Sequence, residues 1–497
     1  MRARFADCFA SAAPPFHCLP DNVYHCIRLK DADMMICCRT YDCPKHYTEA
    51  WQCLIAEHIE GGHLRPSDSL YALLCFLIPK ADPNDNPHWV NDFRALNDNT
   101  IPDAYPLPTV QSILADCGKG KIWAKINMTN AFFQTRVHPD DIKYTAVTTP
   151  FGLYEWTVMP QRLRNAPATH QQRMFNALHP YIGRFCHVYL DDIIIWSDNL
   201  EEHRKNVATV LTALQKAGLI CSPKKTALFC LELDFLGHHI SQKGIEADGK
   251  KVEKVLDWPI PRSASEVCRF LGLVCYISNF LPALAKHTQI LNALTMKEAE
   301  KSFVWTNNHT STFESIKPLV TSRECLTIIN HNHLDTNNIF VSCDASNFCT
   351  GAVLSFGPTV ETAGPVAFES QVLKGAELNE PVHEKELLAI VRALKKWCSD
   401  LLGAPITVYT DHRTLENFKM QKLLSRRQAH WQELLSQYNH KIVYLPGEDN
   451  TPLIQCLANQ EWPLTMRLLL WLPSMMHPLP WPNGNLLRAL LLLQCLV

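Results

Sequence analysis

The stretch His187–Trp196 reads HVYLDDIIIW and places two adjacent carboxylates, Asp191 and Asp192, between two short apolar runs. Valine, tyrosine and isoleucine favour β-strands, and two polar residues between such runs predict a β-hairpin with a tight two-residue turn. We therefore expect the turn to project both carboxylates from a rigid base. Adjacent acids repel each other unless a cation lies between them. A plain surface turn gives the same local pattern, so the rest of the chain must decide.

A second strand has to contribute a ligand if the two carboxylates hold metal. Phosphodiester chemistry with two divalent cations about 4 Å apart draws carboxylates from separate strands, because Mg²⁺ prefers hard oxygen ligands. The run Ile122–Ile126 predicts a strand that ends at Asn127, the natural place for this second ligand. The amide of Asn127 could offer an oxygen to a cation but brings no charge.

The composition is that of an ordinary globular protein, with 497 residues, of which 47% are hydrophobic, and a formal net charge of −2. The length predicts about two to four domains. The total charge does not indicate nucleic-acid binding, but basic doublets occur at 250–251, 395–396 and 426–427. They are either solvated helix faces or parts of a binding surface.

Cysteines and apolar runs bear on the compartment. The 20 cysteines are scattered without a CxxC pair, which predicts free thiols in a reducing, intracellular environment. The N-terminus lacks the sustained apolar stretch of a secretory signal. Runs such as Leu490–Leu493 are too short to cross a bilayer, so no membrane is expected.

Changes of pattern along the chain predict five segments. Residues 1–60 are rich in Cys, Pro and His and predict irregular structure. Strand-like and helix-like runs alternate over 61–241, and a helical segment is expected within 242–335. A second α/β unit is expected over 336–451. Residues 452–497 are crowded with Leu, Trp, Met and Pro and keep neither helical nor strand periodicity for long.

Three acidic residues mark the second α/β unit. Asp344 ends a predicted strand over 339–343, Asp411 follows another over 406–409, and Glu386 lies on a predicted helix. Two strand ends and one helix can bring three carboxylates together on a pair of metal ions. Each acid could equally be an ordinary surface residue at a strand end or on a helix.

Many short motifs occur in one order over residues 65–450, about four-fifths of the chain. They read IPK at 78–80, DFRALN at 92–97, YPLP at 105–108, FG at 151–152, MPQ at 159–161, NAPA at 165–168, YLDD at 189–192, FLGH at 235–238, FLGL at 270–273 and FVWT at 303–306. Together they resemble the reverse transcriptase–RNase H segment of Gypsy-type LTR retrotransposon Pol polyproteins. The resemblance implies a multidomain fold of the α+β and α/β classes, a right-hand polymerase followed by an RNase H-like domain.

The resemblance also assigns the segments. Residues 1–60 would be a linker and the start of the fingers, and 61–241 the fingers and palm. Residues 242–335 would form the thumb and connection, and 336–451 the RNase H-like domain. Residues 452–497 would be an aberrant tail.

The resemblance implies a role for each candidate polymerase residue. Asp191 and Asp192 match the palm carboxylates, and Asn127 stands at the position of the first palm aspartate. The others match a nucleotide site, Lys80, Arg94, Phe132 against the sugar and Gln161, and a grip on the primer end, Phe235, Leu236 and Gly237. Taken by themselves, Phe132 would be read as a core residue and Arg94 as an ion-pairing residue.

In the second unit, Asp344, Glu386 and Asp411 match the three acids of the RNase H site. Glu384 is the rival of Glu386 on the same helix. Glu386 adjoins the apolar stripe and is therefore better placed to face the sheet.

The chain departs from the family at three places. Asn127 removes a charged ligand, which predicts a loss of at least about a thousandfold in polymerase rate. Arg162 replaces a glycine that would permit positive φ or a close backbone approach, and is expected to crowd the template or the nucleotide site, the alternative being an added phosphate contact. A fourth acid is missing after residues 446–450, which predicts a frameshift near Thr451.

The resemblance implies an RNA-directed DNA polymerase with RNase H activity and two Mg²⁺ ions in each site. It also implies an RNA template, a DNA primer, RNA–DNA hybrid and dNTPs as partners, with a dimer or other polyprotein segments as further partners, in cytoplasmic particles or the nucleus. One alternative is an impaired relic that keeps nucleic-acid binding or RNase H activity. Another is a binding protein recruited to a new role. The loss of periodicity over residues 452–497 argues against this alternative.

Overall fold

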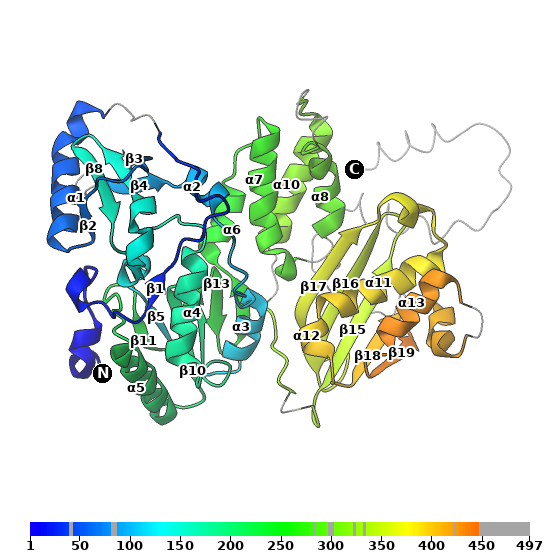
Figure 1. Cartoon of the computed structure of the whole chain (residues 1–497). Coiled ribbons are helices and arrows are strands. Elements are labelled where there is room, and N and C mark those ends of the chain that lie inside the picture. Colours follow the sequence, from blue (N-terminus) through cyan, green and yellow to red (C-terminus); the bar gives the residue numbers. More distant parts are fainter. Residues whose placement is uncertain are drawn as a thin grey trace.

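The computed structural model describes residues 1–38, 43–80, 87–281, 284–296, 303–321, 325–331, 334–421 and 424–446. Figure 1 shows three parts in a row: an N-terminal part with two large sheets, a middle part of helices, and a C-terminal sheet with helices on it. The expected aberrant tail over 452–497 and the end of the second unit after residue 446 lie outside the described residues.

The hairpin predicted from His187–Trp196 is formed by β9 (Cys186–Tyr189) and β10 (Asp192–Ser197). Both strands belong to a four-stranded sheet of order β11-β5-β10-β9, with β5 (Ile122–Asn127) and β11 (Ala227–Cys230). The predicted strand that ends at Asn127 is therefore confirmed as β5, and it runs antiparallel to β10.

Helices bury both faces of this sheet, which explains the unbroken apolar run of β10. They are α3 (Val110–Cys117), α4 (Ala166–Leu178) and α5 (Leu200–Lys216). Ile193 and Ile195 pack with residues of α4 and α5, whereas Ile194 and Trp196 pack with residues of α3. Because successive side chains of a strand point to opposite faces, this alternation fixes β10 from both sides. The carboxylates at its start therefore stand on a rigid base.

The turn of the hairpin lies one residue earlier than predicted. Asp192 pairs with Tyr189 inside the sheet, so the turn consists of Leu190 and Asp191 rather than Asp191 and Asp192. The observed register pairs the buried Val188 with the buried Ile193 and leaves Leu190 in the turn, where Gln171 Oε1 accepts its backbone N–H at 2.8 Å. Leu190 adopts a left-handed conformation with φ 53°.

A second sheet of the N-terminal part has the order β2-β8-β7-β3-β4. Its strands are β2 (Leu64–Pro66), β3 (Leu73–Ile78), β4 (His88–Asp92), β7 (Val147–Thr149) and β8 (Gly152–Trp156), and α2 (Arg94–Asn99) follows β4. The expectation of irregular structure over residues 1–60 is wrong at its end, where Thr48–Glu60 forms α1. Trp51, Leu54 and Ile55 recur at helical spacing and are buried, which stabilises this helix against the sheet.

Residues before α1 also contribute short regular elements. A turn of 3₁₀ helix spans Arg2–Cys8, and β1 (Tyr24–His25) pairs in parallel with β6 (Arg136–Val137). The segment before α1 is therefore joined to the rest of the N-terminal part by the two-stranded sheet of β1 and β6.

The middle part begins with a three-stranded sheet of order β12-β13-β14. Its elements are β12 (Glu232–Phe235), β13 (His238–Ser241), β14 (Gly244–Ala247), α6 (Gly249–Leu256), α7 (Ala264–Tyr276), α8 (Leu284–Ala293) and α10 (Asn307–Thr321). The connection to the C-terminal part is tied at both sides. Leu326 exchanges backbone hydrogen bonds with Ile245 of β14, and the N–H of Thr327 donates to the carbonyl of Pro365 at 2.6 Å.

The C-terminal part is a five-stranded sheet of order β17-β16-β15-β18-β19. Its elements are β15 (Asn338–Ala345), β16 (Cys349–Gly357), β17 (Gly364–Val372), α11 (Val382–Lys396), α12 (Cys398–Leu401), β18 (Ile406–Thr410), α13 (Arg426–Leu435) and β19 (His440–Tyr444). β15 pairs antiparallel with β16 and parallel with β18. The two strands and the helix predicted for this unit are confirmed as β15, β18 and α11.

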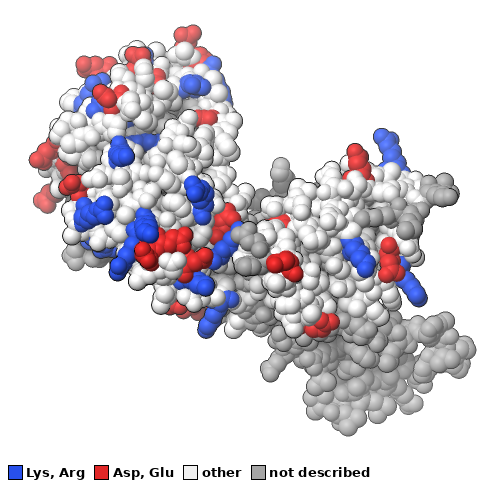
Figure 2. Space-filling view, turned by 90° about the horizontal axis from the view of Figure 1, so that it is seen from below, with Lys and Arg blue, Asp and Glu red and all other residues white. Residues whose placement is uncertain are grey.

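The surface mixes both signs of charge. On the face drawn in Figure 2, Lys and Arg side chains surround a group of Asp and Glu side chains in the N-terminal part. One member of each basic doublet is engaged within the protein: Lys251 lies over the Tyr276 ring, Lys396 pairs with Glu369, and Arg427 pairs with Glu380. Within the described residues the cysteines form no disulfide bonds, and none of the described helices is long and apolar enough to span a bilayer.

Candidate active sites

The first site lies where β5 meets the hairpin. Asn127 is opposite Asp192 in the register of β5 and β10, and its side chain is 6% exposed. Its amide Nδ2 donates to Asp192 Oδ1 at 2.9 Å and lies 3.4 Å from Asp191 Oδ2. Lys125 Nζ is 3.4 Å from the same Asp192 Oδ1. The structure thus brings together the three residues predicted from sequence, with a hydrogen-bond donor in the position of the expected third acid.

The turn that carries Asp191 is held by a residue that sequence reasoning missed. Gln171 of α4 is buried, accepts the backbone N–H of Leu190 at 2.8 Å and donates to the carbonyl of Val188 at 3.0 Å. A third contact runs from the N–H of Met128 to the carbonyl of Asp191. A glutamine on a helix gives no signal of this role in the sequence, because the role depends on how α4 packs under the hairpin.

The four predicted nucleotide residues are not all in one place. Lys80 and Gln161 line a cavity of about 390 Å³ between α1, β4 and the 3₁₀ turn Ala131–Gln134. Phe132 is half-buried, is not among the lining residues, and lies with its ring centroid 5.7 Å from that of His170. Arg94 is 85% exposed and forms a bidentate ion pair with Asp92, at 2.8 and 2.6 Å. The structure thus brings two of the four residues to this cavity.

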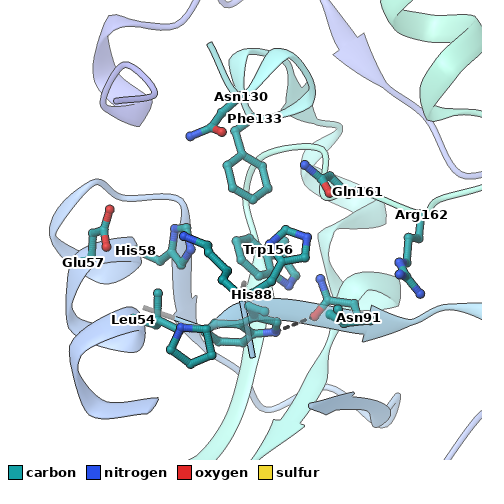
Figure 3. A pocket seen from close by; sticks show the side chains of 14 residues that line it. Leu54, Glu57, His58, His88, Asn91, Asn130, Phe133, Trp156, Gln161 and Arg162 are labelled. Carbon is teal, nitrogen blue, oxygen red and sulfur yellow. Dashed lines mark hydrogen bonds between the residues drawn. The ribbon is translucent and has the colours of Figure 1, made fainter. Parts of the chain in front are cut away.

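Figure 3 shows that aromatic side chains form the inner wall of this cavity. The ring of His58 lies edge-on to Trp156 and Phe133, with centroids 5.0 and 5.5 Å apart, and Phe133 stacks on Trp156. Burial, with a smaller effect of His63, lowers the pKa of His58 to about 4. The wall is therefore neutral near pH 7, and two cationic residues, Lys80 and Arg162, also line the cavity.

Arg162, which stands where the family has glycine, adopts φ 75°. This is the left-handed conformation that glycine takes without a steric cost. Asn97 holds this backbone: its Nδ2 donates to the carbonyl of Arg162 at 2.9 Å, and its Oδ1 accepts the N–H of Arg164 at 2.8 Å. The exposed Arg162 side chain is one of the residues that line the cavity (Figure 3).

The predicted primer grip is a hairpin turn with one buried anchor. Phe235 is fully buried, whereas Leu236 and Gly237 form the two-residue turn between β12 and β13 with φ 47° and 70°. The φ of Gly237 favours glycine, and a Cβ there would also displace the flexible end of the Lys251 side chain. Lys125 Nζ lies 5.6 Å from the centre of the Phe235 ring, which places the hairpin next to the first site.

The second site brings Asp344, Glu386 and Asp411 together. One carboxylate oxygen of each lies within 4.8 Å of the others, and no other group of three His, Cys, Asp or Glu residues among the described residues is this close. β15 and β18 are parallel neighbours, so the acids at and beyond their carboxyl ends meet at one edge of the sheet. The helix α11 supplies Glu386 from above that edge.

Glu386 is the buried member of this cluster, 1% exposed. Its Oε1 accepts the N–H of Ala345 at 3.0 Å, and its Oε2 has no hydrogen-bond partner among the described residues. Burial, together with the nearby carboxylates of Asp344 and Asp411, raises the pKa of Glu386 to about 9. Burial and Asp411 also raise the pKa of Asp344. Three crowded carboxyl groups with an unpartnered oxygen are the donor set that suits a hard divalent cation.

Glu384, the alternative to Glu386 on the same helix, contacts α13 instead of the acidic cluster. Its Oε1 accepts the side-chain N–H of Gln428 on α13 at 3.0 Å. Glu384 and Glu386 are two residues apart, and a helix turns by about 200° over two residues, so only one of them faces the sheet. That residue is Glu386.

The first site fits metal less well than the second. It has two carboxylates rather than three, and the amide N–H groups of Asn127 point at both of them. A bound cation would have to displace these donors.

The comparisons with known proteins agree with this architecture. Residues 78–240 match the family model of the reverse transcriptase (RNA-dependent DNA polymerase), and residues 335–438 match that of the RNase H-like domain found in reverse transcriptase. This chain carries a reverse transcriptase domain followed by an RNase H-like domain. Both domains are enzymes by family.

Three relatives place these domains among retrotransposon polyproteins. The retrovirus-related Pol polyproteins from transposons opus and 297 of Drosophila melanogaster are each 34% identical, over 83% and 80% of this chain and 42% and 37% of their own lengths. The transposon Tf2-3 polyprotein of Schizosaccharomyces pombe is 33% identical over 83% of this chain and 31% of its own length. The chain therefore spans less than half of each of these relatives. The resemblance to a retrotransposon Pol segment is confirmed, and the Gypsy subtype stays a prediction.

Solved structures share the fold. The foamy viral protease–reverse transcriptase with double-stranded DNA superposes with a TM-score of 0.77 at 23% identity, over 89% of this chain and 77% of that one. The same viral protein with RNA/DNA hybrid gives a TM-score of 0.73 at 23% identity, over 97% and 62%. The predicted right-hand polymerase with an RNase H-like domain is thus the observed fold.

Proposed function

We propose that the RNase H-like domain hydrolyses the RNA strand of RNA–DNA hybrids with Mg²⁺, two ions in the site, held by Asp344, Glu386 and Asp411. The observation that carries this proposal is the convergence of these three carboxylates within 4.8 Å, with Glu386 Oε2 unpartnered among the described residues. When bound, the metal supplies an activated water and charge stabilisation for phosphodiester cleavage. The parts of the chain are those of Pol polyproteins, and one structural neighbour was solved with RNA/DNA hybrid.

The residues of the site have separate tasks in this proposal. Asp344 and Asp411 at the sheet edge set the position of the metal ligands, since β15 and β18 hold them at fixed register. Glu386 arrives protonated in the metal-free protein, because its pKa is near 9. It has to release this proton when a cation binds, so the metal affinity rises with pH below that value.

A matched pair of variants on one helix tests this proposal. Glu386→Gln keeps the size and removes the charge from the cluster, and is expected to lower hybrid cleavage at least about a thousandfold. Glu384→Gln makes the same change at the residue that contacts Gln428 and is expected to leave cleavage within about threefold. The measurement is cleavage of a labelled RNA–DNA hybrid by the full chain in Mg²⁺. Equal rates for the two variants would overturn the assignment.

We further propose that the reverse transcriptase domain descends from an RNA-directed DNA polymerase that used an RNA template, a DNA primer and dNTPs, and that its own synthesis rate is strongly impaired. Supporting observations are the cavity that Lys80 and Gln161 line and the Leu236–Gly237 hairpin, which follows Phe235, a residue in contact with Lys125 of the first site. The impairment follows from Asn127, because the position between the two palm carboxylates holds an uncharged donor instead of an acid.

A further inference from the structure

The palm carboxylates Asp191 and Asp192 already have positive partners within the chain. The amide of Asn127 has two N–H donors on one nitrogen, and this nitrogen lies 2.9 Å from Asp192 Oδ1 and 3.4 Å from Asp191 Oδ2. It can therefore bridge the two acids. Lys125, two residues earlier on the same strand and hence on the same face, adds a full charge 3.4 Å from Asp192 Oδ1.

These donors contact the carboxylate oxygens that a bridging cation would need as its ligands. Asp192 Oδ1 receives both Asn127 and Lys125, and it is also the oxygen that faces β5. The Asp192 side chain is 21% exposed and Asn127 is 6% exposed, so the amide approaches the pair from the protein interior. A buried donor that is fixed by strand pairing gives up no rotational freedom of its own to neutralise the acids.

We infer that the palm site is neutralised from within, by the Asn127 amide and the Lys125 ammonium, and does not bind a pair of divalent cations. This inference rests on the proposed assignment of the palm and concerns its metal content rather than its rate. The nuclease site of the same chain is the opposite case, since within the described part of the chain its buried Glu386 receives only the N–H of Ala345.

A carboxylate at position 127 would remove this internal neutralisation of the palm acids. Asn127 Oδ1 has no hydrogen-bond partner among the residues that the structure describes. In Asn127→Asp this oxygen would share a negative charge without a donor, and the other oxygen would face Asp191 and Asp192 in place of the lost N–H groups. An unpaired buried charge among like charges is strongly unfavourable unless a cation joins it. The reverted palm should therefore depend on a divalent cation for its stability.

Manganese binding tests the inference without any activity measurement. The full chain is prepared with its nuclease acids neutralised as Asp344→Asn, Glu386→Gln and Asp411→Asn, so that Mn²⁺ bound in the palm can be counted from the free Mn²⁺ signal in electron paramagnetic resonance. No palm-bound Mn²⁺ is expected up to about 1 mM, and adding Asn127→Asp should tighten binding at least about 100-fold. Mn²⁺ that binds while Asn127 is present, and is lost on Asp192→Asn, would overturn the inference.

Thermal unfolding of the same proteins gives the second readout. In EDTA, Asn127→Asp is expected to lower Tm by about 5 °C, and Mn²⁺ should restore it. Asn127→Ala removes the donors without adding charge, so its Tm should not respond to Mn²⁺. A reverted protein that is as stable in EDTA as the Asn127 protein would contradict the proposed internal neutralisation. If the reverted protein does not fold, the count on the Asn127 protein still decides.

Discussion

The palm and the nuclease site offset the repulsion between neighbouring carboxylates in opposite ways. Each gathers acidic side chains at the ends of strands, from one hairpin in the palm and from β15, the end of β18 and α11 in the nuclease site. In the palm, the amide of Asn127 donates to both acids, and Lys125 lies beside them. In the nuclease site a third acid, Glu386, joins Asp344 and Asp411, and burial and their nearby carboxylates raise its pKa to about 9. On the proposed assignments, the palm is stable without metal, whereas the nuclease site holds a protonated Glu386 that loses its proton only when a metal binds.

The difference teaches that a single amide can decide which of the two domains keeps its chemistry. An amide stabilises a carboxylate pair by hydrogen bonding, but it removes a charge that the transition state needs. Activity that depends on a strained or destabilised site is commonly lost when the site gains stability in this way. The reciprocal exchanges should therefore have opposite effects. Asn127→Asp in the palm should raise activity and lower stability without metal, and Glu386→Gln in the nuclease site should lower activity and raise stability without metal.

The largest effect is expected from Asn127→Asp on primer extension. Restoring the third carboxylate should raise the extension rate on an RNA template in Mg²⁺ at least about a thousandfold, which corresponds to roughly 4 kcal/mol. Single-turnover extension of a labelled primer measures this, with the rate of hybrid cleavage as a check that the protein is folded. Asn127→Gln is the control, since it keeps an amide and should gain nothing. If the unaltered chain extends as fast as the reverted one, the contrast between the two sites collapses.

A smaller effect, on stability, is expected from Glu386→Gln without metal. The pKa of Glu386 is raised to about 9 in the folded protein. Between the ordinary glutamate value and 9 the folded state therefore holds a proton that the unfolded state has released, and the free energy of unfolding falls as pH rises. A glutamine side chain at this position escapes the penalty and can donate to Asp344 and Asp411, as Asn127 does to the acids of the palm.

The variant should accordingly be more stable than the parent at pH 8 by on the order of 3 kcal/mol, with the difference vanishing near pH 4. Denaturant unfolding in EDTA across this range measures it. Mg²⁺ should stabilise the parent and not the variant. A constant difference between pH 4 and pH 8 would show that Glu386 is ionised in the folded protein and that the two sites are not opposites.

The sequence predicted both clusters but not what holds them. Asp344, Glu386 and Asp411 could be found because strand ends and an apolar helix stripe are local patterns. The exact turn of the palm hairpin could not, because it depends on how β9 pairs with β10. Gln171 was missed for a similar reason: its two hydrogen bonds to the hairpin exist only once α4 packs beneath it.

Two further cases have simpler causes. The Cys-, Pro- and His-rich composition of residues 1–60 concealed the helical spacing of Trp51, Leu54 and Ile55 that forms α1. Arg94 forms the ion pair that its residue type alone indicates, with Asp92 two residues away, whereas the nucleotide contact that the family resemblance implies stays a prediction. In both cases the local pattern, helical spacing in α1 and a nearby acid at Arg94, indicates the observed structure, whereas the composition and the family resemblance indicate something else.

Backbone strain separates the two domains as well, and it supports the smallest predicted effect. The described residues other than glycine that adopt left-handed φ are all in the reverse transcriptase part, and they are Asn130, Arg162, Leu190, Phe229 and Leu236. Within 334–421 and 424–446 only glycines adopt it. At Arg162 the strain stands where the family has glycine, so it can be removed by one reversion.

Arg162→Gly is expected to raise the free energy of unfolding by about 0.5–1 kcal/mol. The relief of left-handed strain, about 1–2 kcal/mol, exceeds the entropy that glycine adds to the unfolded chain. Arg162→Ala keeps the Cβ and the strain, and should change stability little, because the side chain is exposed. Gln161→Gly next to it has no strain to relieve and should lose about 0.5–1 kcal/mol. Equal losses at 161 and 162 would mean that the Arg162 side chain stabilises the protein through contacts in the cavity, and that this part of the polymerase half is adapted rather than decayed.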